Sequence, residues 1–109
     1  MNVTEATPPT SPADRRPAGW TFLTNHAHIL ILLATDPDLR IRDVAMRVGI
    51  TERAAQRILH DLVEAGYVTR LRHGRRNTYR LVLDQPLRHP VEADHTVAEL
   101  VSVLCPGDR

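Results

Sequence analysis

The amphipathic stretch Thr51–Gly66 constrains the fold more than any other part of the chain. Thr51 suits the N-cap of a helix, where a hydroxyl accepts a hydrogen bond from a free amide of the first turn. Gly66 can adopt the left-handed conformation that ends a helix. Apolar residues recur between them at three- and four-residue spacing, namely Ala55, Ile58, Leu59 and Leu62. The pattern predicts a helix over 51–65 that buries one face.

The opposite face of this predicted helix carries groups that suit DNA. Its polar residues are Arg53, Gln56, Arg57 and His60. Arginine can bind phosphate or guanine through two N–H groups, and glutamine can pair with adenine. Glu52 lies where the helix dipole favours an acid. Because phosphate would repel Glu52, we expect it to accept from cytosine or to exclude wrong sites.

A shorter segment, Ile41–Ile50, precedes this helix and completes a two-helix unit. Val44, Ala45 and Val48 form a shorter apolar stripe, and residues 48–51 are typical of a tight turn between two helices. Together the two segments predict a helix-turn-helix. Its predicted contacts with DNA are Arg42, Arg47, Thr51, Glu52, Arg53, Gln56, Arg57 and His60.

After Gly66 the apolar period changes from helical to alternating. Residues 67–72 and 78–83 alternate, and the residues between them include Gly74 and Asn77, which tolerate positive φ. This pattern predicts a β-hairpin. Its tip and flanks are cationic, so we expect it to contact phosphates rather than to be only a solvated turn. The predicted contacts are Arg70, Arg72, His73, Arg75 and Arg76.

Positive charge is concentrated in the centre of the chain. The net charge of the whole chain is +1, but residues 39–83 hold ten arginines against four acids, and both flanks are acidic. A basic centre between acidic flanks is the electrostatic footprint of a surface that binds a polyanion. All fourteen basic residues are Arg. The use of Arg instead of Lys suits bidentate contacts with phosphate or guanine. We favour the simpler explanation that a GC-rich genome prefers Arg codons.

The N-terminal part of the chain divides into an arm and a helix. Residues 1–19 hold four prolines and few large apolar side chains, which predicts a disordered arm. Residues 20–34 predict a helix that begins after Thr24 or Asn25 and is apolar nearly all round, so it must be buried on more than one side. A domain this small hardly offers two sides. We therefore expect a second copy of the chain to supply one.

The C-terminal part, residues 86–109, is predicted to be a linker and a dimerisation helix. Apolar residues at 97, 100, 101 and 104 form a stripe. Such a stripe either packs back on the core or pairs with its symmetry mate, and we favour the second. The predicted homodimer contacts are Trp20, Phe22, Leu23, Ile29, Val97, Leu100, Val101 and Leu104.

The order of these elements predicts a winged helix-turn-helix over residues 20–85, mainly α with a small β-hairpin. The order is helix, a short edge strand over 39–41, two helices, two hairpin strands and a C-terminal helix. Residues 39–83 resemble the winged-helix bacterial transcriptional regulators of the ArsR and MarR type. Leu62–Val68, L-x-x-A-G-Y-V, followed by a basic turn and an alternating strand carries the resemblance. It implies a homodimeric repressor or activator that binds a pseudo-palindromic operator in double-stranded DNA.

Other kinds of site find little support in the sequence. The helix before the hairpin has no cysteine, Cys105 stands alone, and the six histidines show no ligand spacing, so we predict no metal and no cofactor. A site assembled across a dimer interface stays open. No nucleophile–base constellation or Gly-rich phosphate loop is present, which predicts that the protein is not an enzyme. We expect either no small effector or one at the dimer interface.

The location and an alternative function complete these expectations. One cysteine fits a reducing compartment, and the longest apolar run, Ile29–Ala34, is too short to span a membrane. We expect a cytoplasmic protein that joins the nucleoid when bound to DNA. The alternative is a winged helix for protein–protein contact, whose basic face binds an acidic partner.

Overall fold

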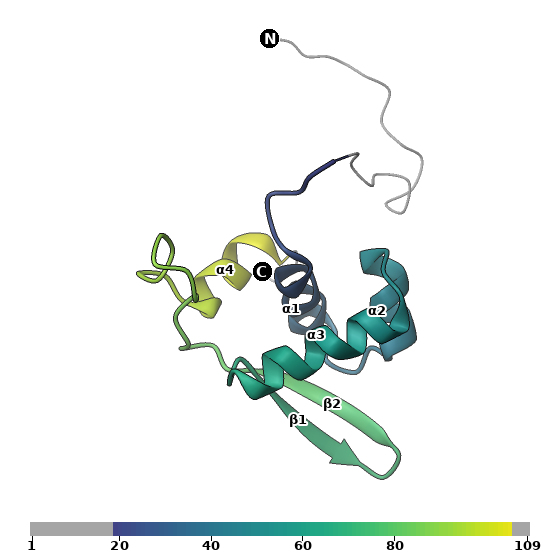
Figure 1. The fold of residues 1–109 in the computed structure, drawn as a ribbon. Helices are drawn as coiled ribbons and strands as arrows, with labels where there is room; N and C mark the ends of the chain where they lie inside the picture. The colour runs from purple at the N-terminus through teal and green to yellow at the C-terminus, as the bar shows by residue number, and fades with distance from the viewer. Residues whose placement is uncertain (1–18, 106–109) are drawn as a thin grey trace.

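The computed structural model describes residues 19–105, which contain four helices and one two-stranded antiparallel sheet. The elements are α1 (Asn25–Thr35), α2 (Ile41–Val48), α3 (Glu52–Glu64), β1 (Val68–His73), β2 (Arg76–Leu81) and α4 (Val97–Leu104). In Figure 1, α2 and α4 lie on opposite sides of α1, and the hairpin projects away from the helices below α3. Nearly all of the predicted N-terminal arm (residues 1–18) lies outside the described residues. No described helix has the length and apolar character needed to cross a membrane.

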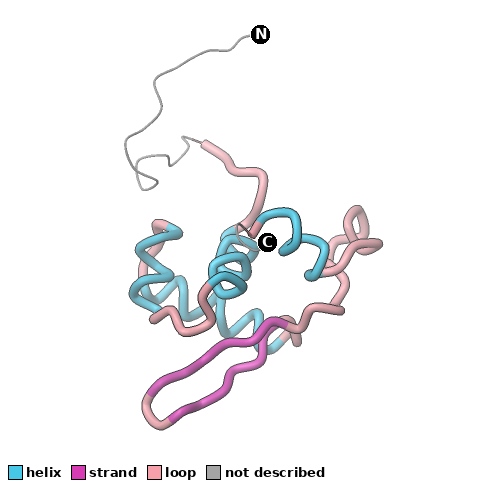
Figure 2. Tube along the Cα trace, turned by 180° about the vertical axis from the view of Figure 1, so that it is seen from behind, coloured by secondary structure: helices cyan, strands magenta, loops and turns pink. Residues whose placement is uncertain are grey.

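The predicted strand over 39–41 is absent from the described residues, so the prediction of three strands was wrong. Arg40 is the N-cap of α2, and Ile41 is already helical. The turn before them approaches the hairpin through a single backbone hydrogen bond, from the Tyr79 N–H to the Pro37 carbonyl (3.2 Å). Because Pro37 has no N–H, it cannot help to build a ladder on β2. The sheet therefore consists of the hairpin, which Figure 2 shows in magenta.

The hairpin has a shorter turn than the sequence predicts. Its strands keep the predicted length of six residues, but both lie closer to the tip. His73 pairs with Arg76, so the turn between the strands consists of Gly74 and Arg75. Gly74 has φ +62°, the positive value that a type II′ turn requires at its first central residue. Asn77 pairs with Arg72 within the ladder and is not a turn residue.

The core lies between α1, α2, α3 and the base of the hairpin. Its buried apolar residues are Ile29, Leu30, Leu33, Val44, Ala45, Ala55, Ile58, Leu59, Leu62, Tyr67, Val68, Tyr79 and Val97. Helix α1 is buried on several sides, as its sequence predicts. The chain's own α4 supplies one of those sides, because Val97 is 0% exposed within this core and the Cys105 thiol lies 3.6 Å from the Ile31 carbonyl oxygen.

The segment between the hairpin and α4 is bonded to the first turn of that helix. The amides of Val97 and Ala98 donate to the carbonyls of Gln85 and Leu83, each over 2.9 Å. A capping box begins α4, with Thr96 and Glu99 exchanging side-chain and backbone hydrogen bonds. The Thr96 amide, and after it the neighbouring His95 side chain, lowers the pKa of Glu99 below its usual 4.5. These bonds hold α4 against the domain.

Truncation of a core leucine tests this packing. Leu33 is 1% exposed and Leu83 is 50% exposed. Leu33→Ala should lower the free energy of unfolding by about 2–5 kcal/mol, because it removes buried methyl groups and leaves a cavity. Leu83→Ala is the matched control and should cost about 1 kcal/mol or less. Urea unfolding followed by circular dichroism, at one fixed protein concentration, measures both. Equal losses would contradict the core position of Leu33.

Candidate nucleic-acid interface

The outer face of α3 is a continuous polar surface. The Thr51 hydroxyl oxygen accepts from the Ala54 amide over 3.0 Å and fixes the start of the helix. The buried side of α3 packs into the core, so residues three and four positions apart on the other side share one exposed face. The predicted DNA contacts here are all exposed: Thr51, Glu52, Arg53, Gln56, Arg57 and His60.

The turn between α2 and α3 depends on one glycine. Gly49 has φ +91°, in the left-handed region, and the Ile50 amide donates to the Ala45 carbonyl over 3.0 Å. This turn places α2 and α3 in contact, as in a helix-turn-helix. Arg42 and Arg47 are exposed on α2, and Arg47 lies in the last turn, where the helix dipole favours a cation.

The hairpin divides its basic residues between two faces. Directly paired residues lie on the same face of a sheet, and successive residues alternate between faces. Arg70 and Arg72 pair with Tyr79 and Asn77 and therefore share one face. The other face carries the remaining paired basic residues of the ladder, which are His73, Arg76 and Arg80. The structure therefore does not gather all of the predicted hairpin contacts on one surface.

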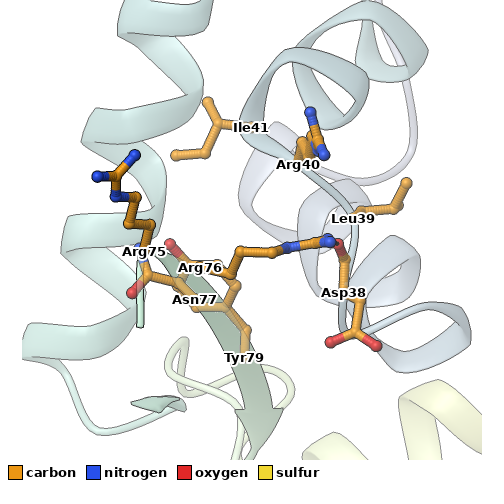
Figure 3. A pocket seen from close by; sticks show the side chains of 8 residues that line it. All are labelled: Asp38, Leu39, Arg40, Ile41, Arg75, Arg76, Asn77 and Tyr79. Carbon is orange, nitrogen blue, oxygen red and sulfur yellow. Dashed lines mark hydrogen bonds between the residues drawn. The ribbon is translucent and has the colours of Figure 1, made fainter. Parts of the chain in front are cut away.

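One arginine that the predicted contacts omit lies beside the tip of the hairpin. Arg40 borders an open pocket of about 380 Å³ together with Arg75 and Arg76. Figure 3 shows these three side chains around the pocket, with Arg76 extending across it toward Asp38. Arg40 is the N-cap of α2, but its side chain makes no capping hydrogen bond. The free amides of the first turn of α2 are therefore not capped by this residue. No sequence pattern pointed to Arg40, because its nearness to the tip of the hairpin arises only in the fold.

The arginines of the basic centre keep their charge exposed. All ten arginines of residues 39–83 are exposed, and none lies within salt-bridge distance of a carboxylate among residues 19–105. Among residues 19–105, the two side-chain contacts at salt-bridge distance both join a histidine to a carboxylate. His26 bonds Asp61 over 2.9 Å, and His95 bonds Glu99 over 3.1 Å. The positive charge that the sequence concentrates here is therefore not neutralised locally.

The predicted dimer contacts fall into two groups. Ile29 and Val97 are 0% exposed within one chain, where they belong to the core. Trp20 and Phe22 are 69% and 92% exposed, and their rings meet edge to face with centroids 4.9 Å apart. Leu104 is also exposed, while the half-buried members are Leu23, Leu100 and Val101. Among the predicted dimer contacts, the exposed apolar side chains therefore come from the segment before α1 and from α4.

The described residues contain no group of three or more His, Cys, Asp or Glu side chains that could hold a metal ion. They do contain an open, mainly apolar pocket of about 430 Å³. It lies between the start of α1, the end of α3 and residues 87–92, and Leu30, Leu62 and Leu100 are among its lining residues. From the sequence we expect either no small effector or one at the dimer interface, whereas this pocket lies within one chain.

Comparison with known proteins identifies the family. A model of the MarR family matches residues 20–76, which include α1, both helices of the helix-turn-helix, β1 and the hairpin turn. A search of curated protein sequences found no match. The likeness to ArsR regulators stays a prediction. The family match covers more than half of the chain and agrees with the helices and hairpin described above. The chain therefore belongs to the MarR family, whose winged-helix domain indicates a DNA-binding transcription regulator.

Proposed function

We propose that the protein is a sequence-specific transcription regulator that binds double-stranded DNA as a homodimer. The observation that supports this most is the set of ten exposed arginines in residues 39–83, which have no carboxylate partner among the described residues. Such a surface favours binding to a polyanion such as a nucleic acid. Each arginine that neutralises a phosphate releases condensed counterions, which lowers the free energy of binding. The match to the MarR family supports DNA as this polyanion.

In this proposal α3 enters the major groove. Arg53 and Arg57 are one turn apart on its exposed face and read guanines or clamp phosphates. Gln56 lies between them and pairs with adenine. Glu52, in the first turn, accepts from cytosine or excludes other bases. His60 extends the same face toward the end of the helix.

The remaining basic residues contact the DNA backbone. Arg42 and Arg47 of α2 anchor phosphates on one side of the groove. The hairpin is the wing, and its exposed basic residues contact the backbone or the minor groove alongside. They are Arg70, Arg72, His73, Arg75 and Arg76. Arg40 joins them, because it borders the same pocket as the wing tip.

Two subunits bind two half-sites about one helical turn apart, roughly 34–36 Å. The exposed Trp20–Phe22 pair and the outer side of α4 supply the contact between subunits. A regulator of this kind works in the cytoplasm, where it joins the nucleoid when bound. The proposal needs no cofactor.

A salt series with two duplexes tests the proposal. The purified chain should bind a labelled duplex from the region upstream of its own gene more tightly than a random duplex of equal length. If six to ten phosphates are contacted per dimer, affinity should fall by about 10³–10⁵ between about 50 and 200 mM salt. Fluorescence anisotropy measures both. If neither duplex binds at low salt, the basic face serves an acidic protein partner instead.

Two arginine variants separate base reading from backbone contact. Arg57→Ala should weaken binding to the upstream duplex by about 1–3 kcal/mol with a smaller effect on random duplex. Arg47→Ala should weaken both duplexes about equally and reduce the salt slope by about one. Each variant is the control for the other, because both remove one exposed arginine. Equal weakening of both duplexes by Arg57→Ala would make Arg57 a phosphate contact.

The oligomeric state tests the subunit contact. Light scattering after size exclusion should give twice the 12.3 kDa mass of one chain. Trp20→Ala and Phe22→Ala should raise the dissociation constant of the dimer about tenfold or more, since aromatic anchors dominate interface energies. Met46→Ala is the control, because Met46 is 63% exposed on α2 and lies outside the proposed contact. A monomer mass at every concentration would refute the homodimer.

A further inference from the structure

The wing has one lateral attachment to the rest of the domain beyond its base. Val68 and Tyr79 are buried, whereas the tip residues 74–76 are exposed. An isolated two-stranded hairpin is at best marginally stable in water, so its direction depends on what its sides touch. The turn Asp36–Asp38 takes the place of a third strand, with the Tyr79–Pro37 bond as its one backbone contact to β2 among the described residues.

Asp38 makes three hydrogen bonds in this region. Its amide donates to the Asp36 carboxylate over 3.2 Å, which fixes the turn. Its carbonyl oxygen accepts from Arg76 Nη2 over 3.3 Å, and its Oδ1 accepts from the Thr78 hydroxyl over 2.9 Å. Figure 3 shows the Arg76 side chain reaching Asp38 across the pocket. Asp38, in the loop before α2, therefore bonds two residues of β2, Arg76 and Thr78, which lie on the same face of the strand.

We propose that Asp38 is a positioning residue that sets the angle of the wing relative to α3. Pro37 stiffens the turn, because its ring fixes φ. The Asp36 bond then presents the Asp38 carboxylate to Thr78 in a preformed geometry. Through this contact Asp38 determines where Arg75 and Arg76 meet the DNA, so the effect on binding rests on the proposed function.

Because Asp38 is negatively charged, substitutions can distinguish a positioning role from a purely electrostatic effect on DNA binding. Asp38 lines the same pocket as Arg40, Arg75 and Arg76, so its negative charge opposes the approach of phosphate to these arginines. Electrostatics alone predicts that removing the acid strengthens DNA binding. Positioning predicts the opposite, since the loss of the acceptor frees the wing. An asparagine side chain would still offer its amide oxygen to the Thr78 hydroxyl, so Asp38→Asn should keep the attachment and lose only the charge.

The first experiment needs no DNA. Amide hydrogen exchange of the full chain should show the Tyr79 amide exchanging about three- to tenfold faster in Asp38→Ala and Thr78→Val, the range that loss of one hydrogen bond gives. Asp38→Asn should stay within about twofold of wild type. Thr69→Val is the matched control, because Thr69 is an exposed threonine of β1 that pairs with Arg80. Unchanged Tyr79 exchange in both disruptive variants would overturn the proposal.

The second experiment measures affinity for the upstream duplex. Thr78→Val and Asp38→Ala should weaken binding about three- to tenfold, whereas Asp38→Asn should bind at least as tightly as wild type. Thr78→Val changes no charge, so its salt slope should equal that of wild type. Tighter binding by Asp38→Ala would overturn the positioning role in favour of charge. If the wild type binds no DNA, the proposed function fails, and the exchange experiment alone decides whether Asp38 holds the wing.

Discussion

The packing of α3 against α1 decides where the exposed polar side chains of α3 lie. Ile58, Leu59 and Leu62 enter the same core as Ile29 and Leu33, and this contact fixes the rotation of α3 about its axis. A helix advances about 100° per residue, so a rotation by one position would bury an arginine and expose a leucine. The large cost of burying an unpaired charge excludes that alternative. The apolar stripe therefore specifies the polar face as strictly as it specifies the core.

Helix α1 shows how a small domain covers an element that is apolar nearly all round. Its sides meet α2, α3, β2 and α4, so the C-terminal helix completes the core within one chain. Val97 is fully buried there and begins α4, which its capping box then stabilises. The proposed contact between subunits is thereby limited to side chains that the core leaves outside, above all Trp20 and Phe22.

Local patterns predicted the helix-turn-helix and the hairpin, while contacts between distant residues accounted for the differences. Periodicity and capping depend on neighbours in sequence, which is why α3 begins after Thr51 as predicted. The strand over 39–41 failed because a strand needs a partner ladder, and Pro37 leaves one backbone bond to β2. The division of the wing arginines follows from the pairing register, which a two-residue turn at Gly74 fixes. Arg40 was missed because its nearness to the wing tip arises only in the fold.

Three of the four acids of the basic centre support the scaffold instead of neutralising the arginines. Asp43 and Glu52 lie in the first turns of α2 and α3, where the helix dipole favours them. Asp61 bonds His26 and so ties α3 to α1. Asp38, just outside the centre, uses its carboxylate to accept from the Thr78 hydroxyl. Mutual repulsion among ten exposed arginines costs stability, and a chain selected for stability alone would place acids beside them. The uncompensated charge suits a polyanionic partner.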